Sequence, residues 1–292
     1  MPYQSRRDFA KGLVAGAGAL GMTAGRVNGA DKLSKIGVQL YTVRNVILNN
    51  PAQVLKAIEE IGYREVELVW ASIDKIWADL KKTSLKPVSI HMDSQLFLPD
   101  KKTELDEALH KAKEHGFEYA VYPAVPRPDR ERGADFFKAM AQKLADAGST
   151  CRKLGLQFCY HNHAFDFRQL GSTTPLEILM SGTSRDTLAL EADVFWVSVA
   201  GHDPVQFLKS YAGRIAMLHL KNKAEGMGVQ FNENVPPSAF REVGSGSLDI
   251  PAILSTAKSI GVKHFFVEQD QTPGDPLESL RASYRYLSGV RF

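Results

Sequence analysis

Short apolar stretches rich in strand-forming residues alternate along most of the chain with longer stretches that have the apolar spacing of a helix. Continuous apolar strands that alternate with helices indicate a parallel sheet covered on its outside. Eight such units follow one another without a linker, which predicts a single (β/α)8 TIM barrel of the α/β class. The strand-like stretches are 36–41, 65–70, 87–92, 119–123, 157–161, 188–194, 215–221 and 264–269.

The helical stretches support the same architecture. They cover 51–62, 106–116, 135–155, 203–213 and 250–261, and several end in the glycine that commonly terminates a helix. An open doubly wound sheet is the alternative, but such a sheet normally carries a glycine-rich turn after its first strand, and TVRN follows Tyr41 here. The longest irregular stretch is 222–247, and a loop of that length is usually a functional lid or disordered.

Residues 1–30 are not expected to belong to the barrel. Residues 5–11 read SRRDFAK, a twin-arginine export motif, and the GLVAGAGALGMTAG behind it is too short and glycine-rich for a stable membrane-spanning helix. We therefore expect an export signal over 1–30, a barrel domain over 31–292 and a periplasmic location. An ordinary basic N-terminus is the alternative.

The charge of the chain bears on its partners. The formal net charge is +3, and the export segment contributes Arg6, Arg7, Lys11 and Arg26 to it. The barrel domain is therefore near neutral, which argues against nucleic acid or an anionic membrane as a partner. We expect a small-molecule partner, and the sequence leaves a homo-oligomer open.

Polar residues gather where the predicted strands end. In barrels of this kind the active site lies at the carboxyl ends of the strands. The strand-end candidates are Glu67, His91, Asp93, His161, Asn162, His163, Glu191, Asp193, His219, Lys221, Glu268 and Asp270.

Four of these candidates end successive strands and make a coherent ligand set: His161, Asp193, His219 and Glu268. Buried imidazoles and carboxylates are costly unless they are paired or bound to a cation. A set of two nitrogens and two carboxylates suits Mn, Co, Zn or Fe better than Ca, so we predict one divalent metal ion here. The alternative is a group of hydrogen-bonded polar residues that fills the top of the barrel.

The motifs YHNHAFDF, LEADVFWV, HLKN and VEQD resemble those of the xylose isomerase-like TIM barrel family, which includes sugar phosphate isomerases/epimerases. The resemblance covers the chain after the export segment, and is greatest to an exported branch whose fifth strand reads YHNH. In the ketose 3-epimerases of this family, the metal ligands are Glu, Asp, His and Glu. The resemblance places the last three on Asp193, His219 and Glu268, and the first on His161.

His161 is a departure from that pattern, because the family's fifth-strand ligand is often glutamate. The two glutamates of the epimerases also shuttle a proton on opposite faces of a sugar carbon. The resemblance therefore makes Glu268 the base on one face and places His161, as a catalytic residue, on the other. Either His161 is a ligand and a different residue completes the pair, or the two-base mechanism is absent. His163 and Asp166 are the nearest substitutes. A reaction with one base, such as β-elimination, is the alternative.

The remaining candidates have weaker signals. Lys221 follows His219 by two residues and is expected to face the same way, where it would bind a substrate oxyanion or phosphate and help catalysis electrostatically; a solvated lysine at the barrel rim is the alternative. Glu67, His91 and His163 are predicted to bind substrate, with a salt bridge at the rim as the alternative for Glu67 and His91.

Taken with the resemblance, these residues predict a metal-dependent sugar isomerase/epimerase that abstracts a proton next to a carbonyl of a small carbohydrate. The predicted export favours a neutral sugar. A lyase or hydratase acting on a keto-sugar is the first alternative, and a non-catalytic sugar-binding barrel is the second. Phosphodiester cleavage of the endonuclease IV type would need more metal ligands and a basic face, and the sequence offers neither.

Overall fold

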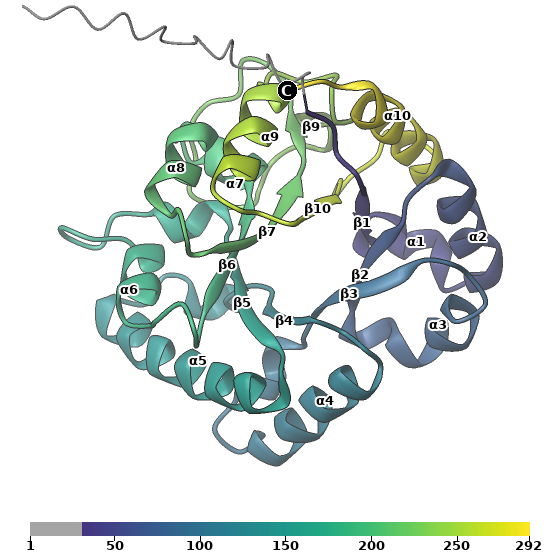
Figure 1. The fold of residues 1–292 in the computed structure, drawn as a ribbon. Helices are drawn as coiled ribbons and strands as arrows, with labels where there is room; N and C mark the ends of the chain where they lie inside the picture. Colours follow the sequence, from purple (N-terminus) through teal and green to yellow (C-terminus); the bar gives the residue numbers. More distant parts are fainter. Residues whose placement is uncertain (1–30) are drawn as a thin grey trace, which may run out of the picture. The chain divides into compact units, whose positions relative to one another are not determined.

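The computed structural model describes residues 31–292, so the predicted export signal lies outside the described residues. Parallel strands close into one barrel in the order β1-β10-β7-β6-β5-β4-β3-β2, with helices around it (Figure 1), which confirms the predicted fold. The barrel strands are β1 (Gly37–Gln39), β2 (Glu65–Val69), β3 (Lys86–His91), β4 (Tyr119–Tyr122), β5 (Gln157–His161), β6 (Ala189–Asp193), β7 (Ile215–Leu220) and β10 (His264–Val267).

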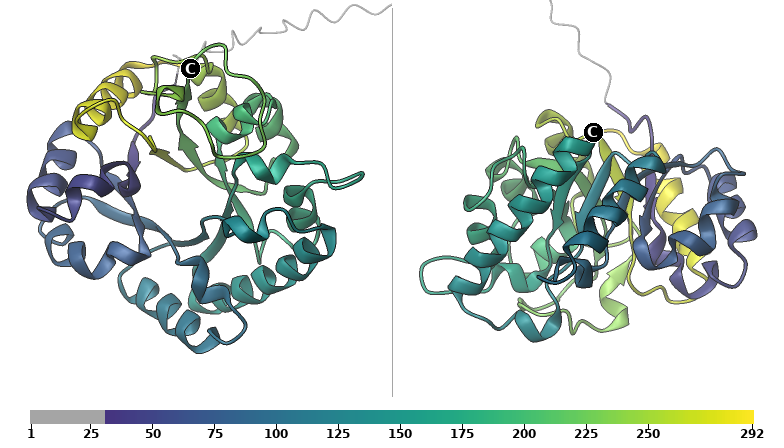
Figure 2. Two further views of the ribbon diagram at one scale, coloured as in Figure 1. Left: turned by 180° about the vertical axis from the view of Figure 1, so that it is seen from behind. Right: turned by 90° about the horizontal axis from the view of Figure 1, so that it is seen from below.

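The helices run alongside the strands on the outside of the barrel, as the side view in Figure 2 shows. The α-helices are α1 (Arg44–Ile47), α2 (Pro51–Ile61), α3 (Ile73–Leu80), α4 (Lys102–Glu114), α5 (Ala134–Leu154), α6 (Pro175–Ser181), α7 (Val194–Val199), α8 (Pro204–Ser210), α9 (Ile250–Ser259) and α10 (Pro276–Gly289). The 3-10 helices are η1 (Leu40–Val43), η2 (Trp70–Ser72), η3 (Ser94–Phe97), η4 (Arg127–Asp129), η5 (Ala164–Phe167) and η6 (Pro237–Ala239).

Local signals in the sequence explain both the agreements and the differences. Helix α2 begins where the Asn50 side chain accepts a hydrogen bond from the Gln53 N–H, and it ends before Gly62, whose φ of 123° favours glycine. The first strand is shorter than predicted. The Gln39 side chain accepts from the Tyr41 N–H and begins a 3-10 helix where the apolar pattern alone predicts more strand.

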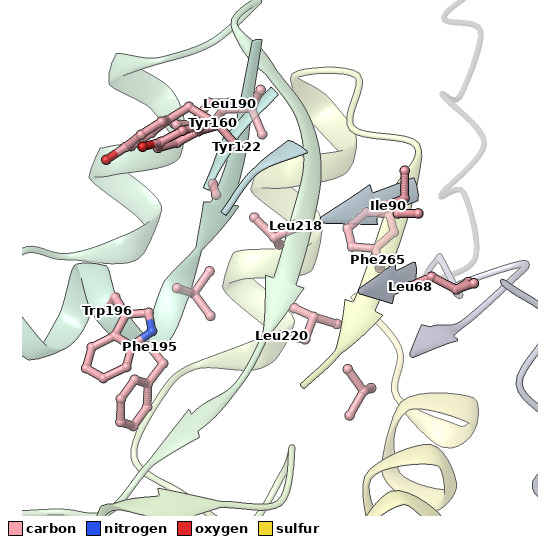
Figure 3. Packing of buried hydrophobic residues seen from close by; sticks show 14 of the residues in the cluster. Leu68, Ile90, Tyr122, Tyr160, Leu190, Phe195, Trp196, Leu218, Leu220 and Phe265 are labelled. Atoms are coloured by element: carbon pink, nitrogen blue, oxygen red, sulfur yellow. The ribbon is translucent and has the colours of Figure 1, made fainter. Parts of the chain in front are cut away.

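The core has two parts because alternate strand residues point to opposite faces. Outward-facing side chains such as Leu68, Ile90 and Leu218 pack beneath the helices (Figure 3). A smaller cluster packs inside the barrel, two residues before the ligand-type side chains on several strands. It consists of Val88, Val121, Cys159, Ala189, Met217 and Phe266.

The long stretch 222–247 is ordered at its base. Strand β8 (Asn222–Lys223) pairs antiparallel with β9 (Phe240–Arg241). The chain between them, residues 224–239, forms a long loop after β7, here called the excursion. At the other extreme of the domain, the backbones of Asp31 and Phe292 exchange two hydrogen bonds. Within residues 31–292, no helix is both long and apolar enough to cross a membrane.

Candidate metal centre

The ligand-type residues come together because each lies on the inward face of its strand. His161 follows Cys159 by two residues, and His219 follows Met217 by two, so they point into the barrel above the small inner cluster. The strand register then places His219 beside Asp193. The four residues predicted from the sequence offer ligand atoms that all lie within 4.8 Å of one another: His161, Asp193, His219 and Glu268.

His161 is held in an orientation that suits a ligand. Its Nδ1 lies 3.1 Å from the carbonyl oxygen of Pro123. A carbonyl oxygen only accepts hydrogen bonds, so Nδ1 carries a proton and the second ring nitrogen, Nε2, faces the site, where a metal ion could take its lone pair. That Nε2 lies 3.3 Å from Asp193 Oδ2. Metal-binding histidines are commonly oriented by such a partner on the second ring nitrogen.

Asp193 is fixed at the junction of strand β6 and helix α7. Its Oδ1 accepts hydrogen bonds from the N–H groups of Phe195 and Trp196, which caps the helix and leaves Oδ2 facing the site. The Asn162 side chain also binds both backbone groups of Asp193, accepting from its N–H at 2.9 Å and donating to its carbonyl at 3.3 Å. Asn162 therefore ties the end of β5 to the end of β6.

His219 has a carboxylate at each ring nitrogen. Its Nδ1 lies 2.9 Å from Glu268 Oε2, and its Nε2 lies 2.6 Å from Glu67 Oε2. Burial opposes the charged ring, but Glu191, Glu67 and Glu268 raise the pKa of His219 well above its ordinary value. A cation at Nδ1 would replace one proton, and Nε2–H would go on donating to Glu67.

Lys221 lies against the same carboxylates. Its Nζ is 2.9 Å from Asp193 Oδ2, 2.6 Å from Glu268 Oε2 and 2.7 Å from Asp270 Oδ1. Burial opposes its charge, but Asp193, Asp270 and Glu268 raise the pKa of Lys221 well above its ordinary value. The ammonium group therefore balances carboxylates that a metal ion would also use.

A second group of ligand-type side chains lies deeper in the barrel and shares His219. It contains Glu67, His91 and Glu191 besides that histidine, again with ligand atoms within 4.8 Å of one another. His91 Nε2 lies 2.7 Å from Glu191 Oε2, which joins strands β3 and β6. Gln39 Nε2 donates to Glu67 Oε2 at 2.8 Å.

One metal ion fits the upper group better than the deeper one. A neutral imidazole has a single lone pair, so His219 can serve only one of the two groups at a time. In the upper group His161 already presents Nε2, while in the deeper group the Glu67 carboxylate also accepts hydrogen bonds from Gln39 and Ser89. Glu67 is therefore suited to hold His219 in place from below.

An open pocket of about 440 Å³ lies over this centre. His161, Lys221 and Glu268 border it directly, whereas Asp193 and His219 are fully buried beneath. Trp196 and Phe240 supply apolar wall. The centre thus has a route to a small molecule, and burial of the ligands keeps most water away from them.

The predicted substrate-binding residues fall in different places. His91 and His163 border the pocket, but Glu67 is fully buried below its floor with its carboxylate engaged by His219, Gln39 and Ser89. Burial and the neighbouring His161 lower the pKa of His163 well below its ordinary value, so its ring is neutral.

Asp166, the other predicted substitute for a second base, is engaged elsewhere. It accepts hydrogen bonds from the Tyr160 hydroxyl at 2.6 Å and from the His163 N–H at 2.8 Å. Burial raises the pKa of Asp166 to about 7. Of the two predicted substitutes for a second base, His163 lines the pocket and Asp166 does not.

Sequence reasoning missed the charged residues that loops bring to the pocket. Arg127 and Arg130 come from the connection between β4 and α5, and Glu233 comes from the excursion between β8 and β9. Strand-end spacing cannot find such residues. The only sequence signal was the length of 222–247, which marked the loop as a possible lid without marking Glu233.

Comparison with known protein families matches residues 55–288 to the family described as "Xylose isomerase-like TIM barrel". The chain is 25% identical over 166 residues to an inosose dehydratase of Lacticaseibacillus casei, a match that covers 53% of this chain. The match spans about half the length of that curated relative, 55%.

Two solved structures share the fold. A sugar phosphate isomerase/epimerase from Parabacteroides distasonis superposes with a TM-score of 0.71 at 22% identity, covering 91% of this chain and 96% of that one. The IolI protein with a bound zinc atom gives a TM-score of 0.66 at 17% identity, covering 86% and 95%.

Proposed function

Because the chain belongs to the xylose isomerase-like TIM barrel family, we propose that it is a metal-dependent sugar isomerase or epimerase. The observation that carries the proposal is the convergence of His161, Asp193, His219 and Glu268 at the floor of an open pocket. A bound divalent ion there would polarise a substrate carbonyl and stabilise negative charge on its oxygen. The IolI structure, which holds zinc, supports the choice of a divalent metal.

In this proposal Glu268 is the base. Burial favours its neutral form, but the charges of Lys221 and His219 lower the pKa of Glu268 well below its ordinary value. The ionised carboxylate borders the pocket and can accept a proton from the carbon next to a substrate carbonyl. Returning a proton to that carbon or its neighbour gives an epimer or an isomer.

Lys221 supports the same step. Its ammonium group lies at the pocket surface of the centre, between Glu268 and Asp270. A positive charge there favours negative charge that develops on the substrate oxygen. Lys221 also keeps Glu268 ionised, so the residue assists both the base and the substrate.

A lyase reaction on a keto-sugar is the second candidate. It is favoured by His161, an imidazole at the position where the resemblance implies a second carboxylate base. One base suffices when the abstracted proton is followed by loss of water from the neighbouring carbon. Similarity to inosose dehydratases, over about half their length, supports this candidate as well.

We further propose that the protein works outside the cytoplasm, on the strength of the SRRDFAK motif at residues 5–11. A folded barrel that already holds its metal could use this export route. A neutral free sugar is then a more natural substrate than a sugar phosphate.

Proton abstraction is tested by solvent exchange. Purified protein loaded with Mn²⁺ is incubated in D2O with a set of keto-sugars, and deuterium uptake next to the carbonyl is followed by NMR. We expect uptake in the wild type and at least a ~100-fold slower rate in Glu268→Gln. Mass spectrometry of the product separates epimerisation from loss of water.

The control for that experiment is Glu225→Gln, which makes the same charge change at an exposed position of the excursion. It should exchange at the wild-type rate. Undiminished exchange in Glu268→Gln, or wild-type protein that exchanges none of the keto-sugars, would contradict the proposal.

A further inference from the structure

A second group of charges borders the same pocket, away from the metal ligands in the chain. Arg130 Nη1 lies 2.7 Å from Glu233 Oε1, and Arg127 Nη2 lies 3.9 Å from Glu233 Oε2. All three residues line the pocket. The group therefore faces whatever small molecule the pocket takes.

Arg130 is held rigidly. Its side chain is only 13% exposed, its Nε donates to the Val125 carbonyl at 2.7 Å, and its guanidinium carbon lies 4.4 Å from the centre of the buried Phe165 ring. Its own carbonyl accepts a hydrogen bond from Arg168. A guanidinium fixed in this way is suited to recognise a planar oxyanion.

The charges of this group do not balance. Arg127 and Arg130 share the single carboxylate of Glu233, whereas the nearby Arg132 and Arg168 have carboxylate partners of their own, Asp129 and Glu131. One positive charge is therefore left in excess at this side of the pocket. Arg130 is the largely buried member and is paired with Glu233, whereas Arg127 is 72% exposed, so an anion that enters the pocket would meet a net positive charge at this side.

Glu233 is an imperfect partner for Arg130. It comes from the excursion between β8 and β9, and its buried Oε1 lies close to Arg130 Nη1 without the alignment of a hydrogen bond. His163 Nε2 lies 3.6 Å from that oxygen, and the His163 ring lies 4.7 Å, centre to centre, from the ring of His161. The His163 ring therefore lies next to both Glu233 and His161, so this charged group adjoins the candidate metal centre.

We infer that Arg130 and Arg127 form a subsite for the carboxylate of a small sugar acid, with Glu233 setting the charge that the subsite accepts. This inference rests on the proposed function and names its substrate class. It replaces the neutral sugar expected from the sequence. One excess positive charge matches a carboxylate, while a phosphate monoester carries about −1.5 to −2 at neutral pH.

Binding tests the inference without turnover. Calorimetric titrations of the Mn²⁺-loaded protein use D-glucuronate, D-glucose and D-glucose 6-phosphate as probes. We expect glucuronate to bind at least ~10-fold more tightly than glucose, a difference of about 1.4 kcal/mol. Arg130→Gln should abolish that difference by weakening glucuronate binding, and Glu233→Gln should shift the preference towards glucose 6-phosphate.

Two further variants serve as a second test of the subsite and as its matched control. Arg127→Gln, at a side chain that is 72% exposed, keeps the test valid should Arg130→Gln fail to fold, and it should reduce the preference for glucuronate. Arg132→Gln, whose guanidinium pairs with Asp129, should leave it unchanged.

Equal affinities for glucuronate and glucose in the wild type, no binding of glucuronate, or an undiminished preference in Arg127→Gln and Arg130→Gln would overturn the subsite. Metal content and solvent exchange are measured on the same samples. If the preference for glucuronate is absent while metal content and solvent exchange are as expected, the subsite is wrong and the proposed function stands. If the preference is present while metal binding or solvent exchange fails, the proposed function is wrong and the anion subsite stands.

Discussion

At the scale of single residues, Lys221 and a metal ion need the same oxygen atoms. The ammonium group lies within 2.9 Å of Asp193 Oδ2 and 2.6 Å of Glu268 Oε2, both members of the predicted ligand set. Asp270 offers Lys221 a third carboxylate that the ligand set does not use. Metal binding should therefore weaken two of the three ion pairs of Lys221 and leave the pair with Asp270.

Lys221→Met should show both how much Lys221 stabilises the metal-free centre and whether it competes with a metal ion. Without its cation, the buried carboxylates lose their partner, so in EDTA the free energy of unfolding should fall by about 3–5 kcal/mol. Added Mn²⁺ should restore more stability to the variant than to the wild type, because the ion no longer competes with an ammonium group. Thermal unfolding with and without Mn²⁺ measures both effects.

The matched control is Lys209→Met, which removes an exposed lysine of helix α8 and should change neither quantity. A variant of Lys221 that binds Mn²⁺ no better than the wild type would show that the ammonium group and the metal do not compete.

The sequence predicted that the four candidate ligand side chains come together because strand alternation is local. Residues two apart on a strand share a face, and barrel closure brings those faces together, so His161 and His219 could be placed before the structure was known. The depth of Glu67 depends on how the strands are staggered around the barrel, and the pairing of Glu233 with Arg130 depends on how a loop far along the chain packs, so neither could be placed. Spacing carries no information on such contacts.

At the scale of elements, the strands were easier to predict than the helices. All eight barrel strands fall within the predicted stretches or one residue beyond them. The predicted helical stretches do not include helices α1, α3, α6, α7 and α10. The seven-residue α6, PLEILMS, is buried at five positions, and a short apolar run of that kind does not show a helical period.

The packing of α5 gives a test at this scale. Gly148 lies inside that helix, and a Cβ there would collide with the backbone carbonyl of Thr187. Gly148→Ala should therefore destabilise the protein, although alanine favours a helix by about 1 kcal/mol over glycine. The measurement is the midpoint of thermal unfolding.

Gly289→Ala serves as the comparison, because it lies at the end of α10 with open space around its Cβ position. It should leave the midpoint unchanged or raise it. A Gly148→Ala variant as stable as the wild type would mean that α5 can move away from Thr187 without cost.

At the scale of the whole molecule, more observations support the fold than support the reaction. The family match over 55–288 and the closed barrel agree on the fold. The reaction depends on a few side chains that differ between members of one fold. His161 and the proposed Arg130 subsite are the residues of this chain on which its reaction and substrate class would depend.

Export is the proposal that concerns the chain as a whole. Replacing Arg6 and Arg7 together by lysine keeps the charge but removes the paired guanidinium groups of the motif. In a bacterium with an active twin-arginine pathway, the wild type should reach the periplasmic fraction and the double variant should stay in the cytoplasm. Arg26→Lys, outside the motif, should behave as the wild type, and equal export of all three would contradict the proposal.

The metal centre itself is tested most directly by metal content. Residues 31–292 are incubated separately with Mn, Co, Zn and Fe(II), freed of loose ions, and measured by inductively coupled plasma mass spectrometry, beside His161→Ala and the exposed control His110→Ala. About one ion per chain in the wild type and in His110→Ala, with most of it lost in His161→Ala, is the predicted result. A wild-type protein that retains none of these ions would contradict the metal centre and the chemistry proposed for it.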